Sequence, residues 1–169
     1  MTVTVREATP DDAPAVQDVA RESWHAAHDH VLGRDRVTET LEEWYGLEDL
    51  EETIEESRDR RDAIFLVAED GGEIVGFAQA GPHADEPAIG SLYRIYVHPD
   101  RWGAGIGTDL LEAIEETLAA EFDRLWLAVL AENEVGVSFY ESQGFERVGV
   151  QECDLEEGVE EYVYEKPLY

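Results

Sequence analysis

One segment restricts the fold more than any other: two apolar runs separated by a glycine-rich turn and an amphipathic stretch. Residues 89–97 (IGSLYRIYV) and 124–130 (RLWLAVL) are predicted to be buried strands. Between them, apolar residues recur at helical spacing: Ile106, Leu110, Leu111, Ile114, Leu118 and Phe122. A strand, a helix and a strand of these lengths form a βαβ unit, with parallel strands and a right-handed crossover. The chain is therefore expected to build an α/β domain around this unit.

The rest of the chain supplies further strands and helices. Strands are predicted over residues 3–8, 63–69, 73–80, 145–153 and 159–166, and helices from Thr9, over 37–61 and over 134–143. Asp70-Gly71-Gly72 predicts a hairpin turn, and a second turn is expected near Glu156-Glu157-Gly158. There is no repeat and no linker in 169 residues. We expect one domain over 1–169, a central mixed sheet flanked by helices, with strands 89–97 and 124–130 parallel.

The charge of the chain is extreme. It has 41 acidic against 12 basic residues, a net charge of -29, and the acids are spread along its whole length. Such a surface repels itself in dilute solution, but the Debye length falls to about 3 Å in molar salt. We interpret the charge as adaptation to a halophilic, salt-rich cytoplasm. It argues against a nucleic-acid partner, which requires basic patches.

Composition also bounds location and metal content. The single cysteine, Cys153, allows no intrachain disulfide, which fits a reducing compartment. No apolar run is long enough to span a bilayer and the N-terminus has no export signal, so we expect a cytoplasmic protein without a membrane partner. His25, His28 and His30 with Asp29 resemble a metal cluster, but nothing elsewhere completes it. No metal is expected.

A glycine-rich turn connects the strand 89–97 to the following helix. In residues 98–108 (HPDRWGAGIGT), Gly103, Gly105 and Gly107 let the backbone turn several N–H groups toward one point at a helix N-terminus. That arrangement suits a phosphate or pyrophosphate, although glycines also serve tight helix packing. A P-loop would need Gly-Lys-Ser/Thr, which is absent. A dinucleotide fold would need another spacing, and only Glu132, placed like a ribose-binding acid, speaks for it.

Two motifs in succession resemble one known family. Residues 92–111 (LYRIYVHPDRWGAGIGTDLL) are similar to the acetyl-CoA motif of the GNAT superfamily of N-acetyltransferases. Residues 133–145 (NEVGVSFYESQGF) are similar to the motif that follows it there, in the same order and one strand later. The family begins its glycine turn with Gln or Arg, where this chain has Trp102. The neighbouring Arg101 is a candidate for the missing cation.

The resemblance implies a role for each matching residue. The turn would hold the CoA pyrophosphate through the N–H groups of Gly103, Ala104, Gly105, Ile106, Gly107 and Thr108, with Arg101 and Trp102 beside them. The strand end Ile95, Tyr96 and Val97 would pair with the pantetheine arm, which requires strands 89–97 and 124–130 to splay apart. Asn133 would bind the arm from the far strand, and Tyr140 would protonate the leaving thiolate.

The acid is easier to assign than the base. A phenol of pKa about 10 can donate a proton to a thiolate of pKa about 8.5, so Tyr140 is suited to the role. The alternative is a core aromatic beside Phe139, and the surrounding motif favours catalysis. A lysine-like amine of pKa about 10.4 costs roughly 4–5 kcal/mol to deprotonate at neutral pH. The central strand has no acid at Gly90-Ser91, which leaves Glu86 in the preceding loop, its neighbour Asp85, or a water chain.

The expected activity is direct transfer of acetyl from acetyl-CoA to a primary amine in a ternary complex. The acceptor could be a polyamine, an amino acid, an aminoglycoside-like molecule or a protein amino terminus. The acidic residues of 37–61 favour a small cationic amine. Two other classes remain open, a non-catalytic acyl-CoA-binding regulatory module and a nucleotide-binding domain. A homodimer is a further expectation from the resemblance.

Overall fold

The computed structural model describes residues 3–154 and 157–168, which form a seven-stranded mixed sheet in the order β1-β2-β3-β4-β5-β7-β6. Its strands are β1 Val3–Glu7, β2 Ile64–Asp70, β3 Glu73–Pro82, β4 Gly90–Val97, β5 Arg124–Leu130, β6 Glu146–Glu152 and β7 Glu160–Pro167. Its helices are α1 Ala13–Leu32, α2 Arg34–Trp44, α3 Leu47–Arg58, α4 Ile106–Leu118 and α5 Glu134–Ser142, with short 3-10 turns η1 Pro10–Asp12 and η2 Pro99–Arg101.

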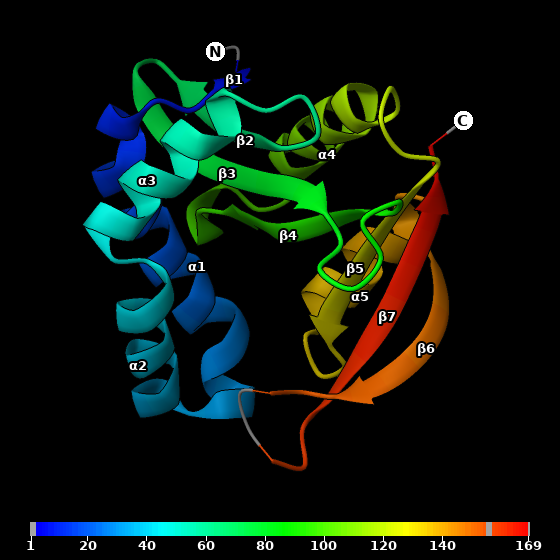
Figure 1. Ribbon diagram of the computed structural model, residues 1–169. Coiled ribbons are helices and arrows are strands. Elements are labelled where there is room, and N and C mark those ends of the chain that lie inside the picture. The colour runs from blue at the N-terminus through cyan, green and yellow to red at the C-terminus, as the bar shows by residue number, and fades with distance from the viewer. Residues whose placement is uncertain (1–2, 155–156, 169) are drawn as a thin grey trace.

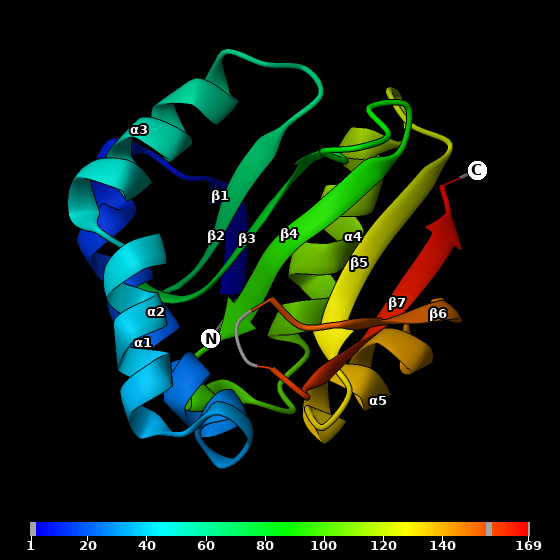
Figure 2. The same cartoon turned by 60° about the horizontal axis from the view of Figure 1, so that its bottom comes forward.

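The helices cover both faces of the sheet (Figure 2). On one face, α4 inserts its apolar stripe into a core shared with α5, and Leu110, Leu111 and Ile114 are fully buried there. On the other, α1, α2 and α3 form a second core through residues such as Val16 and Leu50. The period-3.6 pattern that predicted α4 is thus the pattern of its buried side.

The sheet opens between β4 and β5. These strands are parallel, as predicted, but they pair only at Gly90–Leu125 and Ser91–Trp126. Beyond that point β4 stays with β3 and β5 stays with β7, so the two strands diverge toward their carboxyl ends (Figures 1 and 2). A bulge in the β3–β4 register at Tyr93 bends β4 at the start of this divergence. The predicted splay is confirmed.

Local signals placed most elements within a few residues. The Thr9 start is a capping box with Asp12, although the chain makes a 3-10 turn before α1 begins. The acidic region 37–61 is two helices, and the first starts earlier, at Arg34. The predicted turn near Glu156-Glu157-Gly158 includes Glu156, which lies outside the described residues. Across the described ranges, no helix is long and apolar enough to cross a membrane.

Candidate active site

A cavity of about 660 Å³ occupies the opening between β4 and β5. Its wall is formed by α1, the end of α2, β4, the glycine turn, β5, α5, β7 and the two residues that follow β6. Most of the predicted binding residues line it: Ile95, Tyr96, Val97, Arg101, Trp102, Gly103, Gly105, Ile106, Gly107, Thr108, Asn133 and Tyr140. Two predicted residues, Ala104 and Glu86, are not part of this lining.

The glycine turn presents unpaired backbone donors. Gly103 and Gly105 have φ values of 81° and 84°, in the left-handed region that favours glycine, and Gly105 caps α4. Five N–H groups of the turn donate to no group in the described part of the chain: those of Gly103, Gly105, Ile106, Gly107 and Thr108. The Ala104 N–H instead points to the Arg101 carbonyl at 3.4 Å. Free donors at a helix N-terminus are the requirement for an anion site.

Gly107 is a glycine for a different reason. A Cβ on Gly107 would lie 3.2 Å from the Phe139 ring, closer than ordinary packing allows. The start of α4 therefore approaches α5 through this position. The two explanations left open for the glycines both apply, conformation at Gly103 and Gly105 and close packing at Gly107.

Arg101 and Trp102 hold the turn in place. The Arg101 guanidinium lies 2.5 Å from a carboxylate oxygen of the buried Asp70, which raises the pKa of Arg101. The Trp102 indole N–H donates to the Val97 carbonyl at 2.8 Å. These contacts tie the turn to the β2–β3 hairpin and to the end of β4. Because Arg101 is paired with Asp70, the free N–H groups are the donors most available to an anion.

Tyr140 stands between the core and the cavity. Its ring packs edge-on against Phe139 and Phe145, with centroids 5.3 and 5.8 Å away. Its hydroxyl makes no hydrogen bond to any described group, and burial raises its pKa. Tyr140 therefore carries a neutral O–H that is free to donate to a ligand, and it is a packing residue as well.

Asn133 combines a cap with a free amide. Its Oδ1 accepts from the Gly136 N–H at 3.0 Å and so caps α5. Its side-chain NH₂ donates to no described group, although the residue is buried in the cavity wall. An Asn cap that leaves its amide donors unused fits the expectation that Asn133 contacts a bound arm.

The structure does not bring Glu86 to the cavity. Glu86 is exposed on the β3–β4 loop, where its backbone N–H donates to His83 Nδ1 at 3.2 Å. The carboxylates in the lining are Asp154, just after β6, and Glu161 on β7. Sequence reasoning did not single these two out, because in a chain with 41 acids their proximity in space leaves no local signal.

Aromatic residues of α1 and of the strands form the opposite wall of the cavity. Trp24 and His28 of α1 stand beside Tyr45 and Tyr96, with the Trp24 and Tyr96 centroids 5.7 Å apart. His28 Nε2 lies 3.2 Å from the Tyr96 hydroxyl, and burial is the main cause that lowers the pKa of His28 to about 4. His28 is therefore neutral near pH 7.

The three histidines of α1 have separate partners. His25 contacts Asp29 at 2.7 Å, His28 faces Tyr96, and His30 lies 3.3 Å from the Glu132 carbonyl. Among the described residues, no group of three or more metal-binding side chains converges.

Comparisons with known proteins match this chain to acetyltransferases. The model of the acetyltransferase (GNAT) family matches residues 21–145. A spermidine N(1)-acetyltransferase of Thermoplasma acidophilum is 28% identical over 166 residues, covering 98% of this chain and 99% of its own. The crystal structure of the PaiA N-acetyltransferase of that organism in complex with coenzyme A has a TM-score of 0.85 and 27% identity, covering 99% of each chain. A ribosomal-protein-alanine N-acetyltransferase from Brucella melitensis has a TM-score of 0.77 and 27% identity, covering 97% of this chain and 99% of its own.

Proposed function

Because this chain belongs to the GNAT family of acetyltransferases, we propose that it transfers the acetyl group of acetyl-CoA directly to the primary amine of a small molecule. The observation that carries the proposal is the opening between β4 and β5, with free N–H donors at its end. A β-strand edge without a partner can bind an extended amide-containing ligand, and a helix N-terminus can bind its phosphates. The cavity combines both features, as a CoA site requires.

Different residues would bind different parts of CoA. The N–H groups of the turn would hold the pyrophosphate, the backbone of Ile95–Val97 the pantetheine arm, and the Asn133 amide the arm from the other side. No metal is needed for any of these contacts. CoA would be bound by hydrogen-bond donors that have no partner in the protein, and not by cationic side chains. This mode of binding is compatible with the acidity of the chain.

Tyr140 would act as the acid. The amine attacks the thioester carbonyl, the C–N bond forms, the C–S bond breaks, and the thiolate takes the proton of the Tyr140 hydroxyl. The proton of the amine leaves to water or to a carboxylate of the cavity, Glu161 or Asp154. The free hydroxyl of Tyr140 supports this role, because no protein group competes for its proton.

A small acceptor is supported by the relative that acts on spermidine, which matches nearly the whole chain. The Brucella relative is named for a protein amine, so an amino-terminal group is the second acceptor class.

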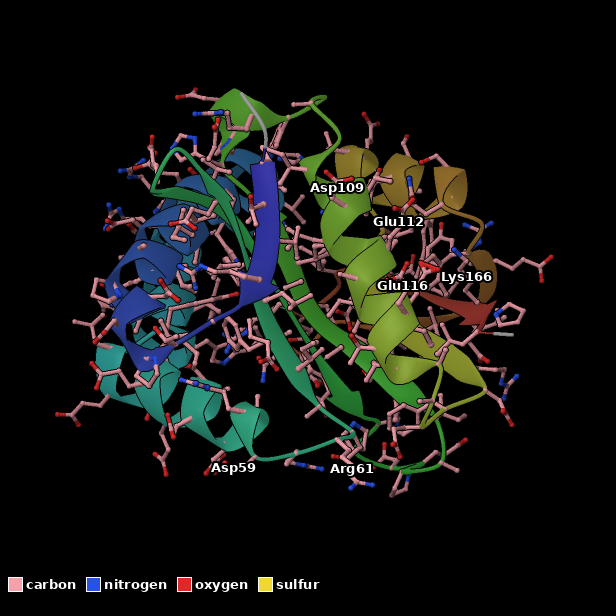
Figure 3. The ribbon with its side chains drawn as sticks, turned by 90° about the horizontal axis from the view of Figure 1, so that it is seen from above. Asp59, Arg61, Asp109, Glu112, Glu116 and Lys166 are labelled. Atoms are coloured by element: carbon pink, nitrogen blue, oxygen red, sulfur yellow. The ribbon has the colours of Figure 1, made fainter. Side chains whose placement is uncertain are left out.

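The acidic surface supports a salt-rich, cytoplasmic environment. Asp109, Glu112 and Glu116 lie along the exposed side of α4 (Figure 3), whereas Glu115 forms an ion pair with the only lysine, Lys166, at 2.7 Å. Exposed acids without basic partners gain from screening in salt. We propose that this surface serves salt adaptation, and the family resemblance keeps a homodimer as the expected assembly.

The direct test is CoA release from acetyl-CoA with a panel of amines, in molar KCl. Turnover with one class of amine supports the proposal and narrows the acceptor. Binding of acetyl-CoA without turnover of any amine would favour the regulatory acyl-CoA-binding module. No binding of acetyl-CoA would refute the proposal.

A further inference from the structure

The cavity wall contains one arginine, Arg94, that forms no ion pair with a described carboxylate. The charged residues in its lining are Arg94, Arg101, Asp154 and Glu161. Arg101 is paired with Asp70, and Glu161 accepts a hydrogen bond from Gln151. Arg94 has no carboxylate within ion-pair distance in residues 3–154 and 157–168.

Neutral groups hold Arg94 in a defined position. Its Nε donates to Gln79 Oε1 at 2.8 Å, and its Nη1 donates to the Trp44 carbonyl at 3.4 Å. Its guanidinium carbon lies 4.7 Å from the Tyr45 ring centroid and 5.6 Å from that of Phe65. A guanidinium has five N–H donors, and the groups that these donors meet, Gln79, the Trp44 carbonyl and Tyr45, are all neutral. Arg94 is thus oriented but not neutralised.

This state is unexpected in such an acidic chain. There are 41 acids for 12 bases, and Arg6, Arg60 and Arg124 are each paired with a carboxylate. The other described arginines without an ion pair are exposed, whereas Arg94 is half-buried. A partly buried cation without a counter-charge is costly to keep. A planar guanidinium fork with free donors matches a carboxylate geometrically. The missing anion can therefore come from the ligand.

We propose that Arg94 binds a carboxylate of the acceptor, so that the acceptor is an amino acid and not a polyamine. The proposal rests on the acetyltransferase function. Arg94 lies on β4 two residues before Tyr96, in the same wall as the aromatic residues of α1. Asp154 and Glu161 supply negative charge for the ammonium group, and a purely cationic acceptor would leave Arg94 unpaired and face its repulsion. The carboxylate takes no part in the bonds that form and break.

The test uses pairs of amines that differ only in a carboxylate: lysine against cadaverine, and phenylalanine against phenethylamine. Initial rates are measured at saturating acetyl-CoA in the same salt. Charge-assisted hydrogen bonds of the usual strength predict that the wild type prefers the carboxylate-bearing partner of at least one pair by about 10- to 100-fold in kcat/KM. In Arg94→Gln that preference should disappear, and Arg94→Lys should keep part of it.

Arg147→Gln is the matched control, because the Arg147 guanidinium also lies over a tyrosine, 4.4 Å from the Tyr162 centroid, but outside the cavity lining. It should leave the preference unchanged. Thermal unfolding and the KM for acetyl-CoA show whether the Arg94 variants are folded. If the Arg94 variants do not fold, the inference is judged from the wild type alone, by its preference for the carboxylate-bearing amine of each pair.

The absence of that preference in both pairs, or faster turnover of spermidine than of either amino acid, would overturn the inference and leave the acetyltransferase proposal intact. So would a preference for amino acids that Arg94→Gln does not change. Turnover of no amine at all would instead count against the proposed function.

Discussion

Substituting Gly105 by alanine tests the left-handed backbone conformation of the glycine turn without introducing a steric clash. Gly105 has φ 84°, and nothing lies within 4 Å of the position that its Cβ would occupy. The cost is therefore conformational, about 1–2 kcal/mol for a left-handed alanine. Reduced entropy of the unfolded chain offsets about 0.4–1 kcal/mol. We expect Gly105→Ala to lower the free energy of unfolding by about 1 kcal/mol.

Acetyl-CoA binding should suffer more than stability. If the backbone relaxes toward negative φ, at least one of the five free N–H groups turns away from the anion site. A hydrogen bond to a charged group contributes about 1.5–3 kcal/mol, so the Kd should rise about 10- to 100-fold. The assays are urea unfolding and calorimetric titration with acetyl-CoA.

Gly33→Ala is the control. Gly33 has φ 86° and open space as well, but it lies between α1 and α2 outside the cavity. It should lose at least as much stability and keep the Kd for acetyl-CoA. An unchanged Kd in Gly105→Ala, or an equal loss of affinity in Gly33→Ala, would refute the assignment of the turn as the phosphate site.

Three further outcomes follow from the structure. His28 has a pKa of about 4 against 6.5 when exposed, so the unfolded chain binds the proton first and stability falls as pH drops from 6.5 to 4. At about 1.4 kcal/mol per pKa unit, the wild type should lose about 3 kcal/mol relative to His28→Asn, as measured by urea unfolding at each pH, and parallel pH curves would contradict this. The KM for acetyl-CoA should fall from dilute to molar KCl, since screening removes the repulsion between the anionic ligand and a chain of charge -29. A KM that rises steadily with salt would contradict this expectation. Asp70→Asn should raise the KM for acetyl-CoA with little change in kcat, because the substitution breaks the ion pair with Arg101 that holds the glycine turn. An unchanged KM would show that Asp70 does not position the turn.

The sequence was most informative where neighbours along the chain decide the structure. The stripe of α4 and the hairpin at Asp70-Gly71-Gly72 are local patterns, and the structure has both. The parallel splay of β4 and β5 followed from chain order and from the family resemblance, not from any single residue.

The sequence was least informative where distant side chains meet. The pairing of Arg101 with Asp70 spans 31 positions, and Glu161 reaches the cavity only because β7 lies beside β5. Glu86 was chosen for its closeness along the chain to the central strand, but its loop faces solvent. Arg94 was not singled out from the sequence, since the lack of an ion-pair partner is visible only in three dimensions.

Comparing Tyr140→Phe with Tyr164→Phe shows whether Tyr140 is the acid that protonates the leaving thiolate. The Tyr140 hydroxyl has no described partner, while the Tyr164 hydroxyl donates to Glu141 at 2.8 Å. Tyr140→Phe should keep its stability and acetyl-CoA affinity but lose about 10²- to 10⁴-fold in kcat, as expected for removal of a general acid. Tyr164→Phe should lose about 1 kcal/mol of stability and keep its kcat. An undiminished kcat in folded Tyr140→Phe, with the amine on which the wild type is active, would contradict the role of Tyr140 as the acid.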